Sequence, residues 1–340
     1  MAGGRYGINI GTQNIGISSV STREILVEKN VIAVKGGKTA IAYGDEAYAI
    51  FERAPENVDV VFPVRNSVIS DPSKMMIILE GLYKKLCSGR IIKGADFLIS
   101  IPTDTTEVEK RAFHELIADS RLRPHSVSMI DKSIADAIDC GIEPTDGSGN
   151  MIVNIGADTT DISVIAMGSI VTCKTLKYGG NRFTELIINY IKQNEGVLVG
   201  FKSAEVLKYN LVDLVGKDEP KERSLFGQTI ATGLPAKLTI NTELVTTAIT
   251  DAMETLVDDI EHVLEKATPE IVGDVNNSGI FLAGGSANLG GLARFLANRT
   301  RMKINLVKKP ENCTIRGVTR AFNNQRYDSV RYYPQEKDYD

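Results

Sequence analysis

Short apolar runs alternate with amphipathic stretches along this chain, and the same plan is found in both halves. A short apolar run indicates a strand, whereas apolar residues that recur at helical spacing indicate a helix. The pattern of the first half predicts a β-meander over 6–29, a mixed region over 31–73, helices over 74–86, 107–118 and 133–140, and strands over 97–101 and 127–130. Thr106 and Glu109 have the spacing of a capping box, which indicates where the second of these helices begins.

The second half repeats this order. The pattern predicts three strands within 151–178, a helix over 183–193, an inserted region over 196–238, a helix over 243–267 and a strand over 279–283. Apolar residues keep a helical period throughout 243–267, and Pro269 is expected to end that helix. Alternating strands and helices in two copies predict an α/β fold with mostly parallel sheets covered by helices, a boundary near 145–150 and a ligand cleft between the halves.

Each half contains a short apolar strand that runs into a glycine-containing turn. The first reads Gly-Ile-Asn-Ile-Gly-Thr from Gly7 to Thr12, and the second reads Val-Asn-Ile-Gly-Ala-Asp-Thr-Thr from Val153 to Thr160. Such a turn presents backbone N–H groups to an anion, and glycine lets the chain come close to it. Two turns in matching contexts predict that one phosphate chain is held from both sides.

The composition is that of an ordinary globular protein, with 43% hydrophobic and 24% charged residues. The 340 residues fit two domains, and a net charge of −4 without a dense basic run gives no reason to expect nucleic acid as a partner. Neither a membrane span nor a signal peptide is predicted. The cysteines lack C-x-x-C spacing and the histidines are isolated, so we predict a cytoplasmic protein with free thiols and no metal ligands among these residues.

Several motifs resemble those of the actin-type ATPase superfamily, and in particular those of the MreB-like bacterial actins. They are GTQN at 11–14, IPT at 101–103 with TEVEKRA at 106–112, the pair Gly179-Gly180 with Phe183, SAEVLK at 203–208, TGLP at 232–235 and GIFLAGGSANLGGL at 279–292. The TEVEKRA and TGLP runs favour MreB-like proteins over actin or the heat-shock chaperones. The resemblance covers 6–321 and implies an actin-like (ribonuclease H-like) fold of duplicated domains, with four subdomains around a central nucleotide cleft, and polymerisation into protofilaments.

The resemblance also implies how the chain is divided. Subdomain IA takes 1–31 and 74–148 with a C-terminal helix near 314–325, IB takes 32–73, IIA takes 149–182 and 239–313, IIB takes 183–238, and 326–340 forms a tail.

The contacts with ATP or ADP are implied in the same way. The resemblance assigns the first phosphate turn to Gly11, Thr12, Gln13 and Asn14, the second to Gly156, Ala157, Asp158, Thr159 and Thr160, and the adenosine contacts to Glu205, Lys208, Gly284, Gly285, Ser286 and Asn288. By spacing alone, Glu205 and Lys208 also fit a surface pair on one helix face. Beside the Gly284–Gly285 turn, we favour contact with the nucleotide.

The acidic residues that this family uses for chemistry are replaced here. Asn9 and Asn154 stand where each turn begins with Asp in the family, Lys132 stands at the catalytic Glu, and Asp158 replaces a glycine. An amide brings no negative charge to Mg²⁺, and an ammonium cannot accept a proton from water. The charge of Asp158 repels phosphate unless it points away. We therefore assign no catalytic residue and no metal ligand, and we treat Asn9, Lys132 and Asn154 as degenerate positions.

Three interpretations of the cleft remain. The chain binds nucleotide but hydrolyses ATP poorly, as a pseudo-ATPase; or it is a scaffold that no longer binds nucleotide; or its site is rewired, with Lys132 in place of the metal's charge. We favour the first two over the third. The loss of one catalytic group commonly costs about a hundredfold in rate, so the combined replacements argue against ordinary hydrolysis.

Two further segments suggest partners. Ile91 and Ile92, flanked by Arg90 and Lys93, lie where the membrane-binding loop of the family falls, and an apolar pair among cations suits an anionic membrane surface. Packing of both isoleucines into the core at a sheet edge is the alternative. The tyrosine-rich tail from Gln325 to Asp340 would suit a neighbouring subunit or another partner, and we expect it to be disordered.

The sequence therefore predicts a bacterial actin-like cytoskeletal protein that self-associates into filaments for cell shape or spatial organisation. A membrane surface or membrane-bound shape proteins are its further expected partners. An active ATPase of the chaperone or sugar-kinase type on the same fold is the main alternative function. An organelle-positioning or segregation filament, similar to the magnetosome filament protein MamK, is the second.

Overall fold

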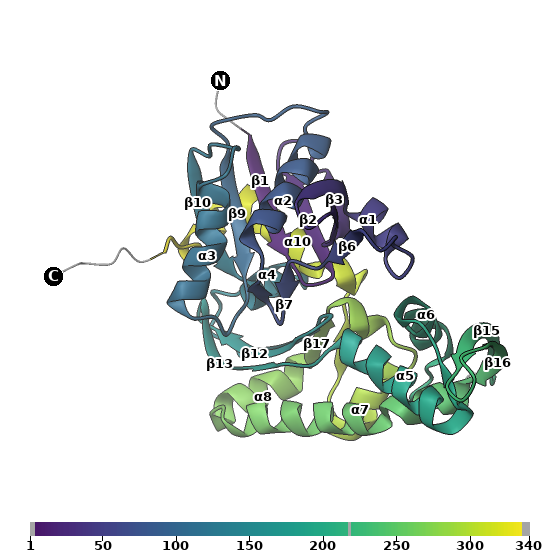
Figure 1. Cartoon of the computed structure of the whole chain (residues 1–340). Coiled ribbons are helices and arrows are strands. Elements are labelled where there is room, and N and C mark those ends of the chain that lie inside the picture. The colour runs from purple at the N-terminus through teal and green to yellow at the C-terminus, as the bar shows by residue number, and fades with distance from the viewer. Residues whose placement is uncertain (1–3, 217–218, 335–340) are drawn as a thin grey trace. The chain divides into compact units, whose positions relative to one another are not determined.

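The computed structural model describes residues 4–216 and 219–334 (Figure 1). It divides into two compact units, which we describe separately. The first unit takes Met1–Ser148, Ile165–Thr175 and Asn312–Asp340, and the second takes Gly149–Val164 and Leu176–Glu311.

The first unit is built on a five-stranded mixed sheet of order β10-β9-β1-β2-β3. Its strands are β1 (Arg5–Ile10), β2 (Asn14–Ser19), β3 (Ile25–Lys29), β9 (Asp96–Ile101) and β10 (Ser126–Asp131). The meander β1-β2-β3 is antiparallel, whereas β1, β9 and β10 run parallel to one another. Parallel strands need crossover connections, and helices of the same unit supply them.

Helices and two small sheets complete the first unit. The helices are α1 (Asp45–Ile50), α2 (Pro72–Leu86), α3 (Glu107–Ala118), α4 (Lys132–Asp139) and α10 (Cys313–Asn323), followed by the 3₁₀ helix η3 (Gln325–Val330). The small sheets contain β4 (Ile32–Lys35), β5 (Thr39–Tyr43) and β6 (Val58–Val61), and β7 (Val64–Arg65) with β8 (Val68–Ile69). Thr106 and Glu109 form both hydrogen bonds of the predicted capping box at the start of α3.

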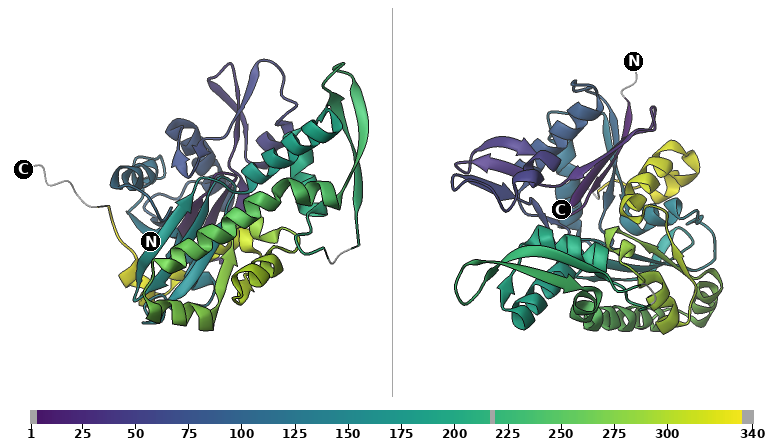
Figure 2. Two further views of the ribbon diagram at one scale, coloured as in Figure 1. Left: turned by 90° about the horizontal axis from the view of Figure 1, so that it is seen from below. Right: turned by 90° about the vertical axis from the view of Figure 1, so that its right-hand side faces the viewer.

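The second unit contains most of another five-stranded sheet, of order β13-β12-β11-β17-β18. Its strands are β11 (Asn150–Ile155), β12 (Thr160–Ala166), β13 (Ser169–Leu176), β17 (Ile280–Ala283) and β18 (Ile304–Leu306). A three-stranded sheet is formed by β14 (Val197–Leu198), β15 (Glu222–Thr229) and β16 (Pro235–Asn241), and Figure 2 shows β15 and β16 as a long hairpin in green. The helical elements are α5 (Gly180–Glu195), α6 (Phe201–Leu211), α7 (Thr242–Glu265), α8 (Pro269–Ser278), η1 (Gly285–Asn288), α9 (Leu292–Thr300) and η2 (Pro310–Asn312).

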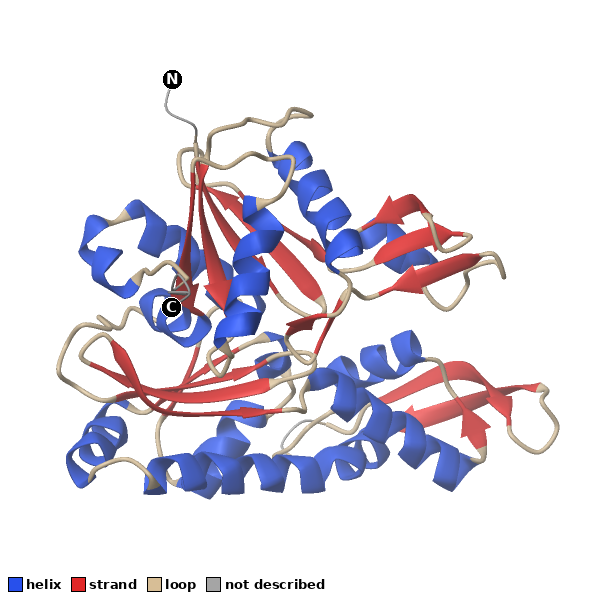
Figure 3. Cartoon of the chain, turned by 60° about the vertical axis from the view of Figure 1, so that its left-hand side comes forward, coloured by secondary structure: helices blue, strands red, loops and turns tan. Residues whose placement is uncertain are grey.

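The two five-stranded sheets have the same internal order. Read from β18, the second sheet runs β18-β17-β11-β12-β13, so β11, β12, β17 and β18 correspond to β1, β2, β9 and β10 of the first. Helices pack against each of these sheets (Figure 3). The predicted two-copy α/β plan is therefore confirmed.

Each unit has its own apolar core. In the first, Ile8 and Phe97 of the central strands pack with Leu79 and Tyr83 of α2. In the second, β11 packs with one face of α5 and with the buried stripe of α7, which includes Ile249, Met253, Leu256 and Ile260. The helical period that we read over 243–267 is therefore the buried face of a single long helix.

Two sequence predictions about elements need correction. Pro269 does not simply end α7, because it is the first residue of α8, a position where proline loses no helical hydrogen bond. The tail is ordered as far as it is described, since η3 buries Tyr327 and Val330 and Tyr332 pairs with Met129. Tyr339 and the rest of 335–340 lie outside the described residues. None of the helices within 4–216 and 219–334 combines the length and the apolar character that a bilayer span requires.

Candidate functional site

The predicted positions of the first unit lie at the carboxyl edge of its parallel strands. Asn9 of β1 is opposite Ser100 of β9, and Ser100 is opposite Ile130 of β10. The Ser100 hydroxyl donates a hydrogen bond to Asn9 Oδ1 at 2.9 Å, so the amide that replaces the expected aspartate is fixed by its neighbouring strand. The carboxyl edge of parallel strands is where α/β sheets bind their ligands.

The first turn leaves this edge as a tight hairpin between β1 and β2. Gly11 N–H donates to the carbonyl oxygen of Asn14 at 3.0 Å, and residues 11–14 are half-buried. Asn30, which follows β3 and is fully buried, donates from Nδ2 to the carbonyl of Gly11 at 2.7 Å and from its backbone N–H to the carbonyl of Gln13 at 2.9 Å. The buried residue Asn30 therefore holds the first turn in place.

Lys132 is the first residue of α4, directly after the end of β10. The adjacent Ser133 shares a hydrogen bond of 2.6 Å with Thr103, which follows β9. Asp131, the N-cap residue of α4, does not cap the helix through its side chain, and its Oδ1 accepts a hydrogen bond from the Tyr332 hydroxyl at 2.9 Å. Burial raises the pKa of Asp131 above its ordinary value, against the opposing effects of Tyr332 and Lys110.

The second turn has the same internal hydrogen bond as the first. Gly156 N–H donates to the carbonyl of Thr159 at 2.8 Å. Its outer contacts differ, because backbone N–H groups of α5 hold it: Gly180 donates to Gly156 O at 2.9 Å and Asn181 donates to Ala157 O at 2.7 Å. The Ser286 hydroxyl adds a third bond to Gly156 O at 3.2 Å.

Asp158 is directed toward the beginning of α5. Its Oδ1 accepts a hydrogen bond from Asn181 Nδ2 at 2.7 Å, and Asn181 is the second residue of that helix. The N-terminal end of a helix stabilises negative charge. This contact gives Asp158 a local partner at the turn.

Lys208 is not part of a surface pair, because only 1% of the residue is exposed. Its Nζ donates to the carbonyl of Gly180 at 2.7 Å and to the Thr184 hydroxyl at 2.8 Å. Glu205 lies one turn earlier on α6 and is half-buried. Lys208 thus ties α6 to the start of α5, next to the second turn.

The predicted adenosine turn follows β17. Gly284 has φ +87°, and a Cβ there would lie 2.4 Å from the carbonyl oxygen of Ile155, so only glycine fits between β17 and the strand that leads into the second turn. Gly285 has no such restriction, since its nearest neighbour would be Glu311 Cβ at 3.9 Å. Ser286, as described above, contacts the second turn directly.

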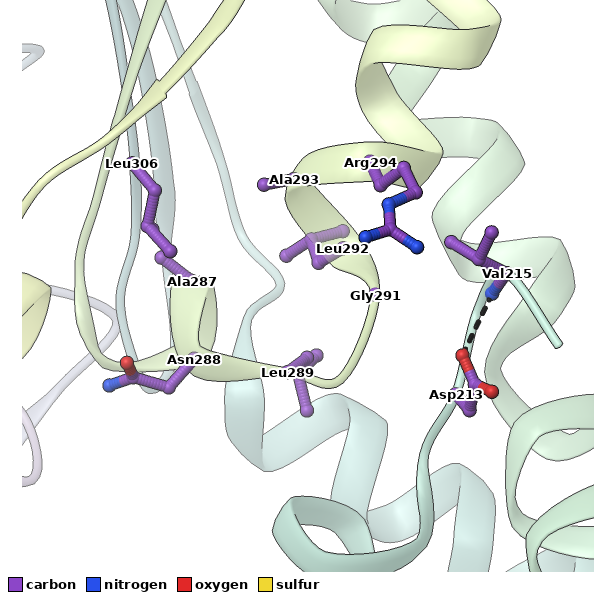
Figure 4. Close-up of a pocket in the computed structure, with 10 residues that line it drawn as sticks. All are labelled: Asp213, Val215, Ala287, Asn288, Leu289, Gly291, Leu292, Ala293, Arg294 and Leu306. Atoms are coloured by element: carbon purple, nitrogen blue, oxygen red, sulfur yellow. Dashed lines mark hydrogen bonds between the residues drawn. The ribbon is translucent and has the colours of Figure 1, made fainter. Parts of the chain in front are cut away.

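Asn288 lies at a pocket of about 400 Å³ in the second unit (Figure 4). Its Nδ2 donates to Glu311 at 3.1 Å. The pocket also contains one cation and one carboxylate, and the carboxylate of Asp213 accepts from the backbone N–H of Val215 at 3.1 Å. It is lined by Asp213, Val215, Ala287, Asn288, Leu289, Gly291, Leu292, Ala293, Arg294 and Leu306.

The structure thus collects the predicted residues in two groups. Asn9, the first turn and Lys132 share one edge of the first unit, and the second turn, Lys208 and Ser286 lie together in the second. Asn154 is buried in β11 opposite Ala283. Ile91 and Ile92 are elsewhere on the first unit, in the loop after α2, and are 36% and 42% exposed, so the alternative of core packing is wrong.

Sequence reasoning missed several residues that support the turns. Asn30, Ser100, Asn181 and Thr184 all contact predicted site residues or their immediate neighbours. A signal existed for two of them, because Ser100 interrupts the apolar run of β9 and Asn30 is a lone amide before the apolar β4. A buried polar residue requires a hydrogen-bond partner. The partner of Asn30 is the first turn, and the partner of Ser100 is Asn9 of β1.

Comparison with known proteins settles the family. The sequence profile described as MreB/Mbl protein matches residues 4–329. The chain belongs to the MreB/Mbl family. Its resemblance to bacterial actins, drawn from the motifs, is confirmed.

Relatives of this MreB/Mbl chain include the cell shape-determining protein Mbl of Bacillus subtilis, with 32% identity over 319 residues, which cover 94% of this chain and 95% of the relative. The cell shape-determining protein MreB of Escherichia coli is 30% identical over 320 residues, which cover 92% of each chain. Among solved structures, MreB5 of Spiroplasma citri bound to AMPPNP superposes with a TM-score of 0.91 at 24% identity, covering 97% of this chain and 98% of that one. A MamK double helical filament gives 0.78 at 21% identity, with 94% and 99% coverage. The actin-like fold is therefore confirmed.

The groups at the edge of the first sheet suit phosphate oxygens better than a metal ion. The side chains there include the Asn9 amide and the hydroxyls of Ser100, Thr103 and Ser133, which complement phosphate oxygens. Within residues 4–216 and 219–334, no three His, Cys, Asp or Glu side chains gather into a group that could hold a metal. Mg²⁺ prefers carboxylate and phosphate oxygens, so the residues present do not fit a protein-held Mg²⁺.

Proposed function

We propose that this chain is a filament-forming bacterial actin that binds ATP or ADP with its two turns and hydrolyses ATP slowly or not at all. The observation that carries this proposal is the pair of matched hairpins, each closed by one glycine N–H bond at 3.0 Å or 2.8 Å. Backbone N–H groups in such turns bind anions without any charged side chain. Support for the ligand class comes from the MreB5 structures, which are bound to AMPPNP and to ADP.

The slow hydrolysis rests on the charges at the edge of the first sheet. Lys132 begins α4 where the family has its catalytic Glu, and an ammonium cannot act as a general base toward water. Asn9 donates no negative charge to a metal, and its carbonyl oxygen is already used by Ser100. The protein would therefore hold a nucleotide by the backbone groups of its turns while lacking the means to activate water.

Affinity measurements with and without Mg²⁺ test this proposal. We expect ATP and ADP to bind to the full chain in isothermal titration calorimetry, and phosphate release to stay near background. Tight binding that is independent of Mg²⁺ would instead support the rewired site, with Lys132 in place of the metal's charge. Brisk Mg²⁺-dependent phosphate release would identify an active ATPase. No binding at millimolar nucleotide would leave a scaffold that has lost its ligand.

A triple substitution tests the assignment of the degenerate positions. We expect Asn9→Asp, Lys132→Glu and Asn154→Asp together to raise turnover about a hundredfold, because they restore two metal anchors and a water-orienting carboxylate. Phosphate release in single-turnover assays measures the change. The matched control is Asn9→Asp with Asn154→Asp alone, which should bind Mg²⁺ without gaining the full rate. Unchanged turnover in a triple variant that still binds ATP would contradict the assignment.

A role in cell shape or spatial organisation is part of the same proposal. Support comes from the relatives named as cell shape-determining proteins and from the MamK filament, which has the same fold. Electron microscopy of the purified chain with and without ATP should show filaments built from regularly spaced subunits. Only monomers at micromolar concentration under both conditions would contradict polymerisation.

Attachment to a membrane surface is proposed through the loop that carries Ile91 and Ile92. Both are exposed, and Arg90 and Lys93 beside them suit anionic lipid headgroups. Co-sedimentation with phosphatidylglycerol vesicles should fall about tenfold in the Ile91→Ser/Ile92→Ser variant. The control, Ile41→Ser/Val68→Ser, removes two other exposed apolar residues of the same unit and should bind like the wild type. Equal binding by all three proteins would remove the loop from the proposal.

A further inference from the structure

The C-terminal segment of the described chain, residues 324–334, lies along the free edge of the first sheet. We call it the C-terminal strap. Asn324 caps η3, whose Tyr327 and Val330 are buried, and the chain then reaches β10. Met129 N–H donates to Tyr332 O at 2.8 Å, and Tyr332 N–H donates to Met129 O at 3.0 Å. The strap thus satisfies backbone groups of an edge strand that would otherwise face solvent.

The side chain of Tyr332 makes a second connection. Its hydroxyl donates to Asp131 Oδ1 at 2.9 Å, and Lys110 Nζ lies 5.6 Å from the centre of its ring. Burial raises the pKa of Tyr332, so the phenol remains a donor at neutral pH. Of the charged groups near this contact, Lys110 and Glu107 come from α3 and Asp131 from the end of β10.

The position of Asp131 also suits a second contact, with the first N–H groups of α4. It is the N-cap residue of α4, and aspartate is among the strongest N-cap residues because its carboxylate accepts from the first free N–H groups of the helix. Here that cap bond is not made, and the carboxylate is bonded to the strap instead. One carboxylate therefore has two competing partners, the strap and the head of α4.

From this competition we infer that the C-terminal strap is a positioning element for the head of α4. While the strap is docked, Tyr332 keeps Asp131 away from the helix end. When the strap leaves, Asp131 caps α4, and the backbone at Lys132 and Ser133 shifts with it. The coupling between the C-terminal strap and the start of α4 does not depend on the proposed function. Only an effect of the strap on a nucleotide beside Lys132 rests on that function.

Hydrogen exchange measured by mass spectrometry tests the coupling without any ligand. Tyr332→Phe removes only the hydroxyl, and we expect exchange of the Met129 amide to rise about tenfold because a hydrogen bond to a charged group is lost. The amides of the first turn of α4 should exchange a few-fold more slowly, because the freed carboxylate caps them. Tyr333→Phe is the matched control, since Tyr333 is 63% exposed and should leave both regions unchanged.

A second variant distinguishes positioning of α4 by the C-terminal strap from a general loss of structure at this edge of the sheet. Asp131→Ala removes the partner of the strap and the potential cap together, so the Met129 amide should exchange faster, whereas the α4 amides have no cap bond to lose and should keep the wild-type rate. Slower exchange of α4 in Tyr332→Phe that is absent in Asp131→Ala supports the inference. Faster exchange of α4 in both variants, or no change at Met129 in Tyr332→Phe, would overturn it.

A measurement of ATP binding then tests whether the C-terminal strap affects the proposed nucleotide site. In a protein that binds ATP, Tyr332→Phe should change the ATP dissociation constant about threefold to tenfold, and Tyr333→Phe should not. An unchanged constant with the expected exchange pattern would refute the link to the nucleotide and keep the link to α4. A wild type that binds no ATP would refute the proposed function, and the exchange experiment would still decide the coupling.

Discussion

The two glycine turns of this chain have the same shape and different supports. Both are hairpins closed by a glycine N–H bond to the residue three positions later. The first is held by the side chain and the backbone N–H of Asn30, whereas the second is held by two backbone N–H groups of α5 and by the Ser286 hydroxyl. The two turns thus share the hairpin and differ in the groups that surround it.

Because of this difference, we expect single side-chain substitutions to affect the two turns to different extents. Backbone N–H groups are present whatever the side chain, so the second turn depends on the close approach of α5 and β17 more than on residue identity. The first turn depends on the side-chain amide of Asn30 for its bond at Gly11 O, beside one backbone bond at Gln13 O. Asn30 Oδ1 is also the one buried side-chain oxygen or nitrogen among residues 4–216 and 219–334 that lacks a hydrogen-bond partner, so the amide is held by its donor side alone.

The largest effect is expected where the second turn meets β17. Gly284→Ala would place a Cβ 2.4 Å from Ile155 O, in a backbone conformation with φ +87°, so we expect a loss of about 3 kcal/mol in the free energy of unfolding. By strand register the corresponding residue of the first sheet is Ile101, where a bulky side chain is accommodated, so glycine is required only beside the second turn. Urea denaturation followed by circular dichroism measures the loss.

Gly285→Ala is the matched control for that change. Its Cβ would meet only Glu311 Cβ at 3.9 Å, an ordinary contact, so stability should change by less than about 0.5 kcal/mol. Similar losses in both variants would show that any side chain in this segment is harmful and that the close approach of Gly284 is not the cause.

A smaller effect should separate the two turns by their side-chain supports. Asn30→Ala removes the bond to the carbonyl of the half-buried Gly11, so we expect a loss of about 1–2 kcal/mol and roughly tenfold weaker ATP binding. Ser286→Ala removes one bond of 3.2 Å from a turn that retains two backbone bonds, and should cost about 0.5–1 kcal/mol. Unfolding curves and ATP titrations of both variants make the comparison. A larger loss in Ser286→Ala would reverse our ranking of the supports.

The shape of the turns could be predicted from the sequence because it is local. Gly11 and Gly156 each follow an apolar strand, and that short pattern was sufficient to predict a hairpin. The capping box at Thr106 and the buried stripe of α7 were predicted for the same reason. The two-copy fold then followed from the repeated order of these local elements.

The supports of the turns could not be predicted because they come from distant parts of the chain. Ser286 and Gly156 are far apart in sequence, as are Tyr332 and Asp131. The tail looked disordered because its tyrosines are spread among charges, and nothing local reveals that β10 is an edge strand with free backbone groups. Lys208 has the spacing of a surface residue, and only the packing of α6 on α5 explains its burial.

The smallest expected effect concerns the charge that distinguishes the two turns. Asp158 occupies the position in the second turn that Gln13 occupies in the first, two residues after the glycine. Asp158→Gln makes the turns alike and removes a carboxylate next to the proposed phosphate site, so ATP should bind a few-fold more tightly. The same change removes an anion near the start of α5, where Asn181 now holds it, and should cost about 0.3–1 kcal/mol of stability. Gln13→Glu is the reciprocal variant, and titration calorimetry should show weaker binding. If neither substitution changes the ATP dissociation constant, the charge of Asp158 is fully neutralised by its contacts at α5, and the turns differ in their supports alone.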